Sequence, residues 1–156
     1  ALKWYLLSAE QGYALAESNL GLMYEEGQGV QQNYEEAIKW YSFAAKKGLS
    51  GAQSKLGIMY QSGKGVIQDY KEAVRLYRQS AKQGNTLGQK YLGVMYVLGQ
   101  GVPKDYVLAH MWFSISGSNG NQNALNSMRL LEEEMSLSQI EKAQGMARKW
   151  EPTRIK

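Results

Sequence analysis

The chain has 156 residues, of which 44% are hydrophobic and 21% charged, and its formal net charge is +4 at pH 7. A chain of this length and composition is expected to bury one sizeable core, and its mild charge argues against a nucleic-acid-binding surface. It has no apolar run near the ~20 residues that a membrane-spanning helix needs, and the lack of cysteine excludes disulfides and thiolate chemistry.

The sequence repeats itself with a period of 36 residues. Glycine recurs at this step at Gly12, Gly48, Gly84 and Gly120. The pattern Leu-Gly-x-Met-Tyr and its close variants keep the same step at residues 20–24, 56–60 and 92–96, and so does Gly-x-Gly-Val at residues 27–30, 63–66 and 99–102. A fixed period of this length indicates a repeat protein in which each unit packs on its neighbours.

Residues 1–12 align with the second helix of a repeat, because Trp4-Tyr5 matches Trp40-Tyr41 one period later. The chain opens at Ala1 inside this helical pattern and has no initiating Met, so we expect the natural protein to extend upstream. The cellular compartment stays open between bacterial cytoplasm, periplasm and secretion.

Residues 13–48 form the first full repeat and predict a helix, a tight loop and a second helix. The first helix is expected over residues 14–26, where Ala16, Leu20, Met23 and Tyr24 share one face. Gly27 is placed to end it, and Val30 is the apolar residue of the loop that is expected to enter the core.

Asn33 is expected to cap the second helix of this repeat. With Glu36 it predicts a capping box, as Asp69 does with Glu72, whereas Asp105 caps without a glutamate. The second helix is predicted to turn four residues inward, namely Ala37, Trp40, Tyr41 and Ala44.

Residues 49–84 and 85–120 form the second and third repeats. A glycine recurs inside each first helix, at Gly21, Gly57 and Gly93, although a helical glycine costs about 1 kcal/mol relative to alanine. We expect these glycines to allow a close helix crossing, with the recurring alanines of the second helix (Ala37, Ala73 and Ala109) in the gap.

Residues 121–156 are expected to be a capping helix pair that closes a single solenoid domain spanning residues 1–156. The pattern predicts one helix from Asn121 to Glu134, with Ala124 and Met128 in register. Ser136 and Gln139 then open a last helix that runs through Trp150.

The combined motif at residues 16–41 and its copies resembles the Sel-one-like repeat (SLR) family, a relative of the tetratricopeptide repeats. The resemblance covers nearly the whole chain and implies an all-α fold, a right-handed α-solenoid of antiparallel helix pairs. It also implies a bacterial adaptor or scaffold for protein complexes. Some members are cysteine-rich, with reported penicillin-binding or β-lactamase activity, and this chain departs from that branch because it has no cysteine.

The residues give little support to catalysis. His110 is the only histidine, and its repeat equivalents Ile38 and Val74 favour a packed structural role over general-base chemistry, which needs a positioned partner. The chain has no Ser-x-x-Lys motif and no second histidine for a zinc site. We therefore predict no catalytic residue, no metal and no cofactor. The tryptophans at 4, 40 and 112 are expected to stack in the core.

The resemblance places a ligand-binding face on the first helix of each repeat, which lines the concave groove of such solenoids. The expected partner-binding residues are Ser18, Leu22, Glu25, Ser54, Ile58, Gln61, Lys90, Val94, Val97 and Leu98, with Leu130 farther along the same line. A second candidate surface is a basic stripe whose spacing of 4, 3 and 4 puts it on one helix face, formed by Lys71, Arg75, Arg78 and Lys82. The pattern favours a solvated outer face for this stripe, with a docking strip for an acidic partner as the alternative.

The sequence thus favours an adaptor that holds a protein or peptide segment. It predicts no nucleic-acid partner and no transmembrane segment, and it leaves the oligomeric state open. The alternatives are a cell-wall or β-lactam hydrolase and a purely structural spacer. For the apolar pair Val97 and Leu98, two explanations stay open: the C-terminal helix pair covers them, or a partner does.

Overall fold

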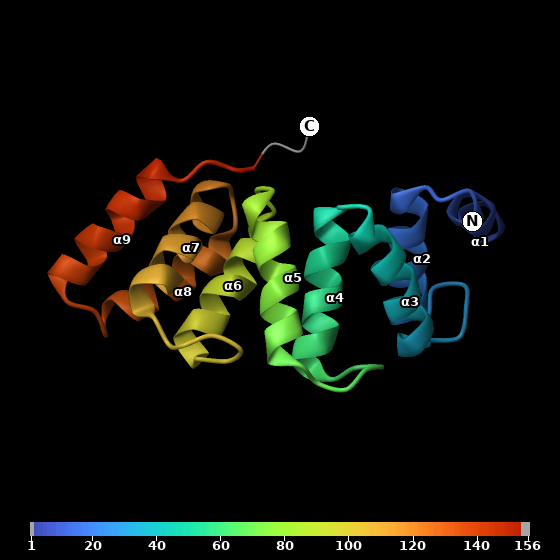
Figure 1. Ribbon diagram of the computed structural model, residues 1–156, viewed down its shortest axis with the longest axis horizontal. Coiled ribbons are helices and arrows are strands. Elements are labelled where there is room, and N and C mark those ends of the chain that lie inside the picture. The colour runs from blue at the N-terminus through green and yellow to red at the C-terminus, as the bar shows by residue number, and fades with distance from the viewer. Residues whose placement is uncertain (1, 154–156) are drawn as a thin grey trace. The chain divides into compact units, whose positions relative to one another are not determined.

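The computed structural model describes residues 2–153, which form nine helices and no strand (Figure 1). No helix in this part of the chain is both long and apolar enough to cross a membrane. The helices are α1 (Leu2–Glu10), α2 (Ala14–Glu26), α3 (Tyr34–Lys46), α4 (Ser50–Ser62), α5 (Tyr70–Lys82), α6 (Thr86–Leu98), α7 (Tyr106–Ser118), α8 (Gln122–Glu132) and α9 (Leu137–Lys149).

The protein is all-α, and its helices pack as sequential pairs that follow the 36-residue period. They divide into two compact units, Ala1–Leu76 and Tyr77–Lys156, and the division falls inside α5. The single domain and the right-handed superhelix stay predictions, because they depend on how the two units are placed.

The first unit packs each helix on the next, α1 on α2, α2 on α3 and α3 on α4. Its larger core cluster contains Ala37, Tyr41, Leu56 and Met59, and a second cluster gathers Ala9, Ala16, Leu20 and Met23. Val30 packs against this second cluster, which confirms that the loop contributes an apolar residue to the core.

In the second unit α7 is the central helix, and it contacts α6, α8 and α9. Phe113 and Ala109 of α7 meet Ala124 and Leu131 of α8 in one core cluster, with Met128 packed against it. Trp112 meets Trp150 edge-on with ring centroids 5.8 Å apart. Ala124 is therefore in the core as expected, whereas α8 ends at Glu132 and not at the expected Glu134.

The first turns of α3 and α5 differ from the prediction that each begins with a capping box. Asn33 and Asp69 do cap their helices, accepting from backbone N–H groups two and three residues later. However, Glu36 and Glu72 do not close capping boxes. Their carboxylates pair with Lys39 and Arg75, because the backbone N–H groups of residues 33 and 69 donate to the carbonyls of Tyr24 and Tyr60. The capping box at Ser136 and Gln139 is present.

Gly21 and Gly93 mark close crossings, and the nearest atoms in each gap belong to an aromatic ring, with the backbone oxygen of the predicted Ala109 3.2 Å from an added Cβ at Gly93. A Cβ added at Gly21 would lie 2.6 Å from the ring of Tyr41, and one at Gly93 would lie 2.7 Å from the ring of Phe113. Both rings lie four residues after the expected alanine. The glycine therefore makes room for a large aromatic ring, which fills more core volume than an alanine would.

The tryptophan prediction is wrong for Trp4, which is 73% exposed, whereas Trp112 is buried. Trp40 is partly buried against the cluster of Ala9, Ala16 and Leu20. The counterparts of that cluster one period earlier would precede residue 1, so no described residue provides the equivalent cover for Trp4.

Candidate functional site

The first helices of the repeats (α2, α4, α6 and α8) carry the predicted partner-binding positions, which we call the helix-A face. In the first unit Ser18, Leu22, Glu25, Ile58 and Gln61 are partly exposed. Ser54 is fully buried, so it does not belong to an accessible surface and is removed from the candidate set. In the second unit Lys90, Val94 and Val97 are partly exposed, and Leu98 is exposed.

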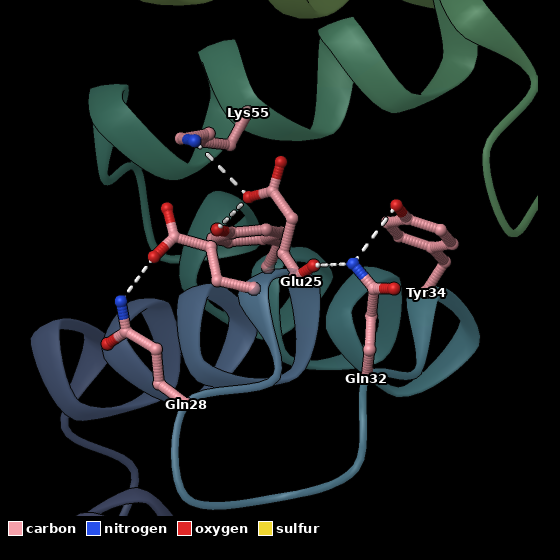
Figure 2. Close-up of polar contacts among 7 residues, drawn as sticks. Glu25, Gln28, Gln32, Tyr34 and Lys55 are labelled. Carbon is pink, nitrogen blue, oxygen red and sulfur yellow. Dashed lines mark hydrogen bonds and ion pairs between the residues drawn. The ribbon is translucent and has the colours of Figure 1, made fainter.

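Glu25 is the centre of a polar cluster in the first unit (Figure 2). One of its carboxylate oxygens accepts from the Tyr41 hydroxyl at 2.7 Å and from the Lys55 ammonium at 3.2 Å. These partners come from α3 and from the first helix of the following repeat. Burial, followed by the bond to Glu25, raises the pKa of Tyr41 well above its ordinary value, so the hydroxyl stays a donor. Glu25 is thus committed to contacts within the chain.

The loop after α2 is held to the same cluster. The Gln32 amide donates to the Glu25 carbonyl at 2.8 Å and to the Tyr34 hydroxyl at 3.2 Å, and the Gln28 amide bonds to Glu26 (Figure 2). The next repeat keeps the main contact, because Gln68 donates to the Gln61 carbonyl at 2.8 Å. These bonds fix where the exposed end of each first helix lies.

The second unit shows what the same register holds one period later. The positions equivalent to Tyr41 and Lys55 are Tyr77 and Tyr91, and their rings stack at 5.3 Å with planes 12° apart. Lys90 lies 4.9 Å from the centroid of the Tyr91 ring, a cation–π distance. An ion pair is therefore replaced by an aromatic stack at this helix junction.

One period further, the residues at these three positions are uncharged and leave an open space between their helices. Its residues are Val97, Phe113 and Ser127, and all three line a hollow of about 300 Å³ between α6, α7 and α8. The small Ser127 stands where Lys55 and Tyr91 supply long side chains. The other lining residues are Val94, Leu98, Tyr106, Leu130, Leu131 and Glu134.

The two residues of the apolar pair Val97 and Leu98 differ in how much of each is covered within the chain. Val97 packs against the core cluster of α7 and α8, so the C-terminal helix pair covers much of it. Leu98 stays 55% exposed, and Leu130 on the opposite wall is 67% exposed. The structure therefore brings Val94, Val97 and Leu98 together with Leu130, but leaves two leucines open to solvent.

The basic stripe is exposed along α5, and two of its four cations already have partners within the chain. In the first unit Arg75 pairs with Glu72 at 2.5 Å, and in the second unit Arg78 donates to the Tyr96 hydroxyl at 3.2 Å. Glu72 compensates the charge of Arg75, which weakens the attraction of the stripe for an acidic partner, whereas the bond to the neutral Tyr96 hydroxyl leaves the charge of Arg78 unchanged.

His110 is buried, as its apolar repeat equivalents indicated. Its Nε2 lies 2.7 Å from a carboxylate oxygen of Glu132 on α8, and its Nδ1 has no hydrogen-bond partner in the described structure. Such a pair orients a ring, but a general base must reach its substrate. Residues 2–153 also contain no cluster of three or more acidic or histidine side chains that could hold a metal.

We expect the purified protein not to hydrolyse a chromogenic β-lactam. The reason is that the His110 ring is inaccessible and the sequence offers no Ser-x-x-Lys nucleophile. The measurement is the absorbance change with wild-type protein and with His110→Ala. Turnover by the wild type that disappears in His110→Ala would contradict this expectation.

Sequence reasoning missed six residues of these sites, namely Tyr41, Lys55, Tyr91, Phe113, Ser127 and Glu134. Three of them, Lys55 with its equivalents Tyr91 and Ser127, differ at one repeat position, and a comparison of that register would have identified it. The role of Tyr41 and Phe113 was hidden because an aromatic residue at a core position predicts only packing.

The comparisons with known proteins agree with this architecture. The Sel1 repeat model matches residues 1–13, 14–49, 50–85 and 86–121, one residue later than the repeat limits expected for the full repeats. No match was found among the curated proteins.

Three solved structures are similar. A protective antigen present in uropathogenic Escherichia coli strains, described as displaying an SLR fold, is 36% identical with a TM-score of 0.90. A Sel1 repeat protein from Oxalobacter formigenes is 38% identical with a TM-score of 0.76. The cysteine rich protein B of Helicobacter pylori shares the fold at 24% identity and a TM-score of 0.63.

The three matches cover most of this chain but different shares of the other chains. They cover 95%, 81% and 78% of this chain, in the order given, and 32%, 52% and 92% of the other chains. This chain therefore spans about a third and about half the length of the first two. Because the repeat model matches residues 1–121 almost without a break, the chain belongs to the Sel1 repeat family.

Proposed function

We propose that this chain is a protein-interaction module that holds a peptide or protein segment on its helix-A face. The observation that carries the proposal is the open apolar hollow between α6, α7 and α8, where Leu98 and Leu130 stay exposed. Burying one such side chain fully is worth roughly 1.5–3 kcal/mol. A partner that covers these two leucines would therefore gain binding free energy from the apolar surface that it removes from water.

The first unit supports the proposal in a different way. There the helix-A face is polar, and Glu25 is fixed by Tyr41 and Lys55. A side chain held in one position loses little conformational freedom on binding. In the first unit the polar side chains would therefore contribute specificity for a partner.

Site-specific photo-crosslinking in cells that naturally make the protein tests the proposal. A photoreactive amino acid is placed at Ile58 or at Leu98 on the helix-A face, and at Leu137 as a control. Leu137 suits this purpose because it is 71% exposed and does not line the hollow. We expect one protein to be crosslinked from the face positions and not from Leu137.

The crosslinked protein is then purified and its dissociation constant measured. We expect Leu98→Ser combined with Leu130→Ser to weaken binding at least tenfold, about 1.4 kcal/mol. The melting temperature should hardly change, because both leucines are exposed. Equal crosslinking from all positions, or normal binding by the double variant, would favour the structural spacer.

A further inference from the structure

The hollow between α6, α7 and α8 has an apolar interior. Its floor is the buried ring of Phe113, and its walls include Val94, Val97 and the exposed Leu98 and Leu130. Ligand pockets range from about 300 to 1,000 Å³, so this hollow lies at the small end. Its size and lining suit one apolar side chain of a bound polypeptide.

The rim of the hollow at the end of α8 is acidic. Glu134 lines the hollow, and Glu132 and Glu133 precede it. All three lie at or just beyond the C-terminus of α8, where the helix dipole is also negative and carboxylates are unfavourable. Negative charge is therefore concentrated there against the preference of the helix itself.

The acidic residues near this rim differ in their partners, and the last turn of α8 carries one basic residue, Arg129. Glu132 contacts His110, but no ion pair within residues 2–153 involves Glu133 or Glu134. Lys104 holds its ammonium 4.8 Å from the centroid of the Tyr106 ring, and it lines a neighbouring hollow with Tyr106 and Gln139.

We propose that this hollow receives one large apolar side chain of a partner polypeptide, and that Glu134 binds a lysine or arginine next to that side chain. The proposal rests on the proposed function and specifies the chemistry of its partner. Apolar burial would supply affinity, whereas the acidic rim would reject a segment whose apolar residue is flanked by acids.

Short synthetic peptides test this recognition directly. The main probe has the sequence Gly-Ser-Lys-Leu-Lys-Ser-Gly, and two matched probes replace its leucine with serine or both lysines with glutamate. Binding to the full chain is followed by NMR from the methyl signals of Leu98 and Leu130. We expect the lysine–leucine peptide to bind at least tenfold more tightly than either matched probe.

Two protein variants separate the apolar contribution from the charged one. Leu130→Ser should weaken the main probe at least tenfold, whereas Leu137→Ser, a change at an equally exposed leucine outside the hollow, should not. Glu134→Lys should reverse the preference toward the glutamate-flanked peptide, whereas Glu141→Lys on α9 should not. If all three peptides bind alike, or Leu130→Ser and Glu134→Lys bind as the wild type does, the proposal is wrong.

The other occupant of such a hollow is a second copy of this chain. Sedimentation of the wild type across a range of concentrations tests it, and we expect a monomer. Self-association that disappears in Leu130→Ser would overturn the proposed partner. Specific crosslinking from Leu98 together with no peptide preference would overturn only this inference, whereas no specific crosslinking would remove the proposed function as well.

Discussion

Gly21→Ala should lower the free energy of unfolding by about 1–3 kcal/mol, although alanine is the better helix former. The added Cβ would lie 2.6 Å from the Tyr41 ring, closer than carbon atoms pack. Tyr41 is buried and its hydroxyl is tied to Glu25, so the ring has little room to move. Chemical denaturation of both proteins, with the midpoint and slope fitted, measures the difference.

Gly51→Ala is the matched control for this change. Gly51 lies in α4, and an added Cβ there would meet nothing within 4 Å. We expect this variant to be as stable as the wild type or up to about 1 kcal/mol more stable. If Gly21→Ala behaves like Gly51→Ala, the α2–α3 crossing is looser than the structure shows.

A double-mutant cycle identifies the ring as the cause. Tyr41→Leu removes the aromatic atoms that the new methyl group would strike, so Gly21→Ala should cost less in that background. Contacting residues usually show coupling of about 0.5–3 kcal/mol. An equal cost in both backgrounds would place the strain elsewhere in α2.

Lys47→Met should destabilise the protein by about 2–3 kcal/mol, because it isolates a buried carboxylate. The Glu17 side chain is only 5% exposed, and one of its oxygens is 2.5 Å from the Lys47 ammonium. Its other oxygen already has no hydrogen-bond partner. Lys47 itself is 41% exposed, so solvent screens part of the effect and the lower end of the range for buried pairs applies. Thermal and denaturant unfolding measure the loss.

Glu17→Gln should restore most of that stability in the Lys47→Met background. The equivalent residues in the next two repeats are Gln53 and Gln89, and each side-chain amide donates to a backbone carbonyl of the preceding helix, Ala45 or Ala81, at 3.2 Å. A glutamine at position 17 should donate in the same way to the carbonyl of Ala9, which is the repeat equivalent of Ala45 and Ala81. If the double variant is no more stable than Lys47→Met alone, the loss does not come from the isolated carboxylate.

Local signals in the sequence determined where the helices begin and end. The 36-residue period placed the helix of residues 14–26 at its observed bounds. Such signals act within one turn of the chain: Gly27, Gly63 and Gly99 end their helices at φ near +70°, and an asparagine or aspartate side chain caps the next helix. The family followed from the same repeated motif.

The tertiary structure decided which side chains meet. Ser54 was expected on the helix-A face and is buried, and Gly21 and Gly93 lie closest to aromatic rings. The hollow depends on three helices at once, because Val97, Phe113 and the small Ser127 line it at positions that hold Glu25, Tyr41 and Lys55 two periods earlier. The period assigns each residue to a face, but whether a junction is filled depends on the summed volumes and charges of residues far apart in the chain.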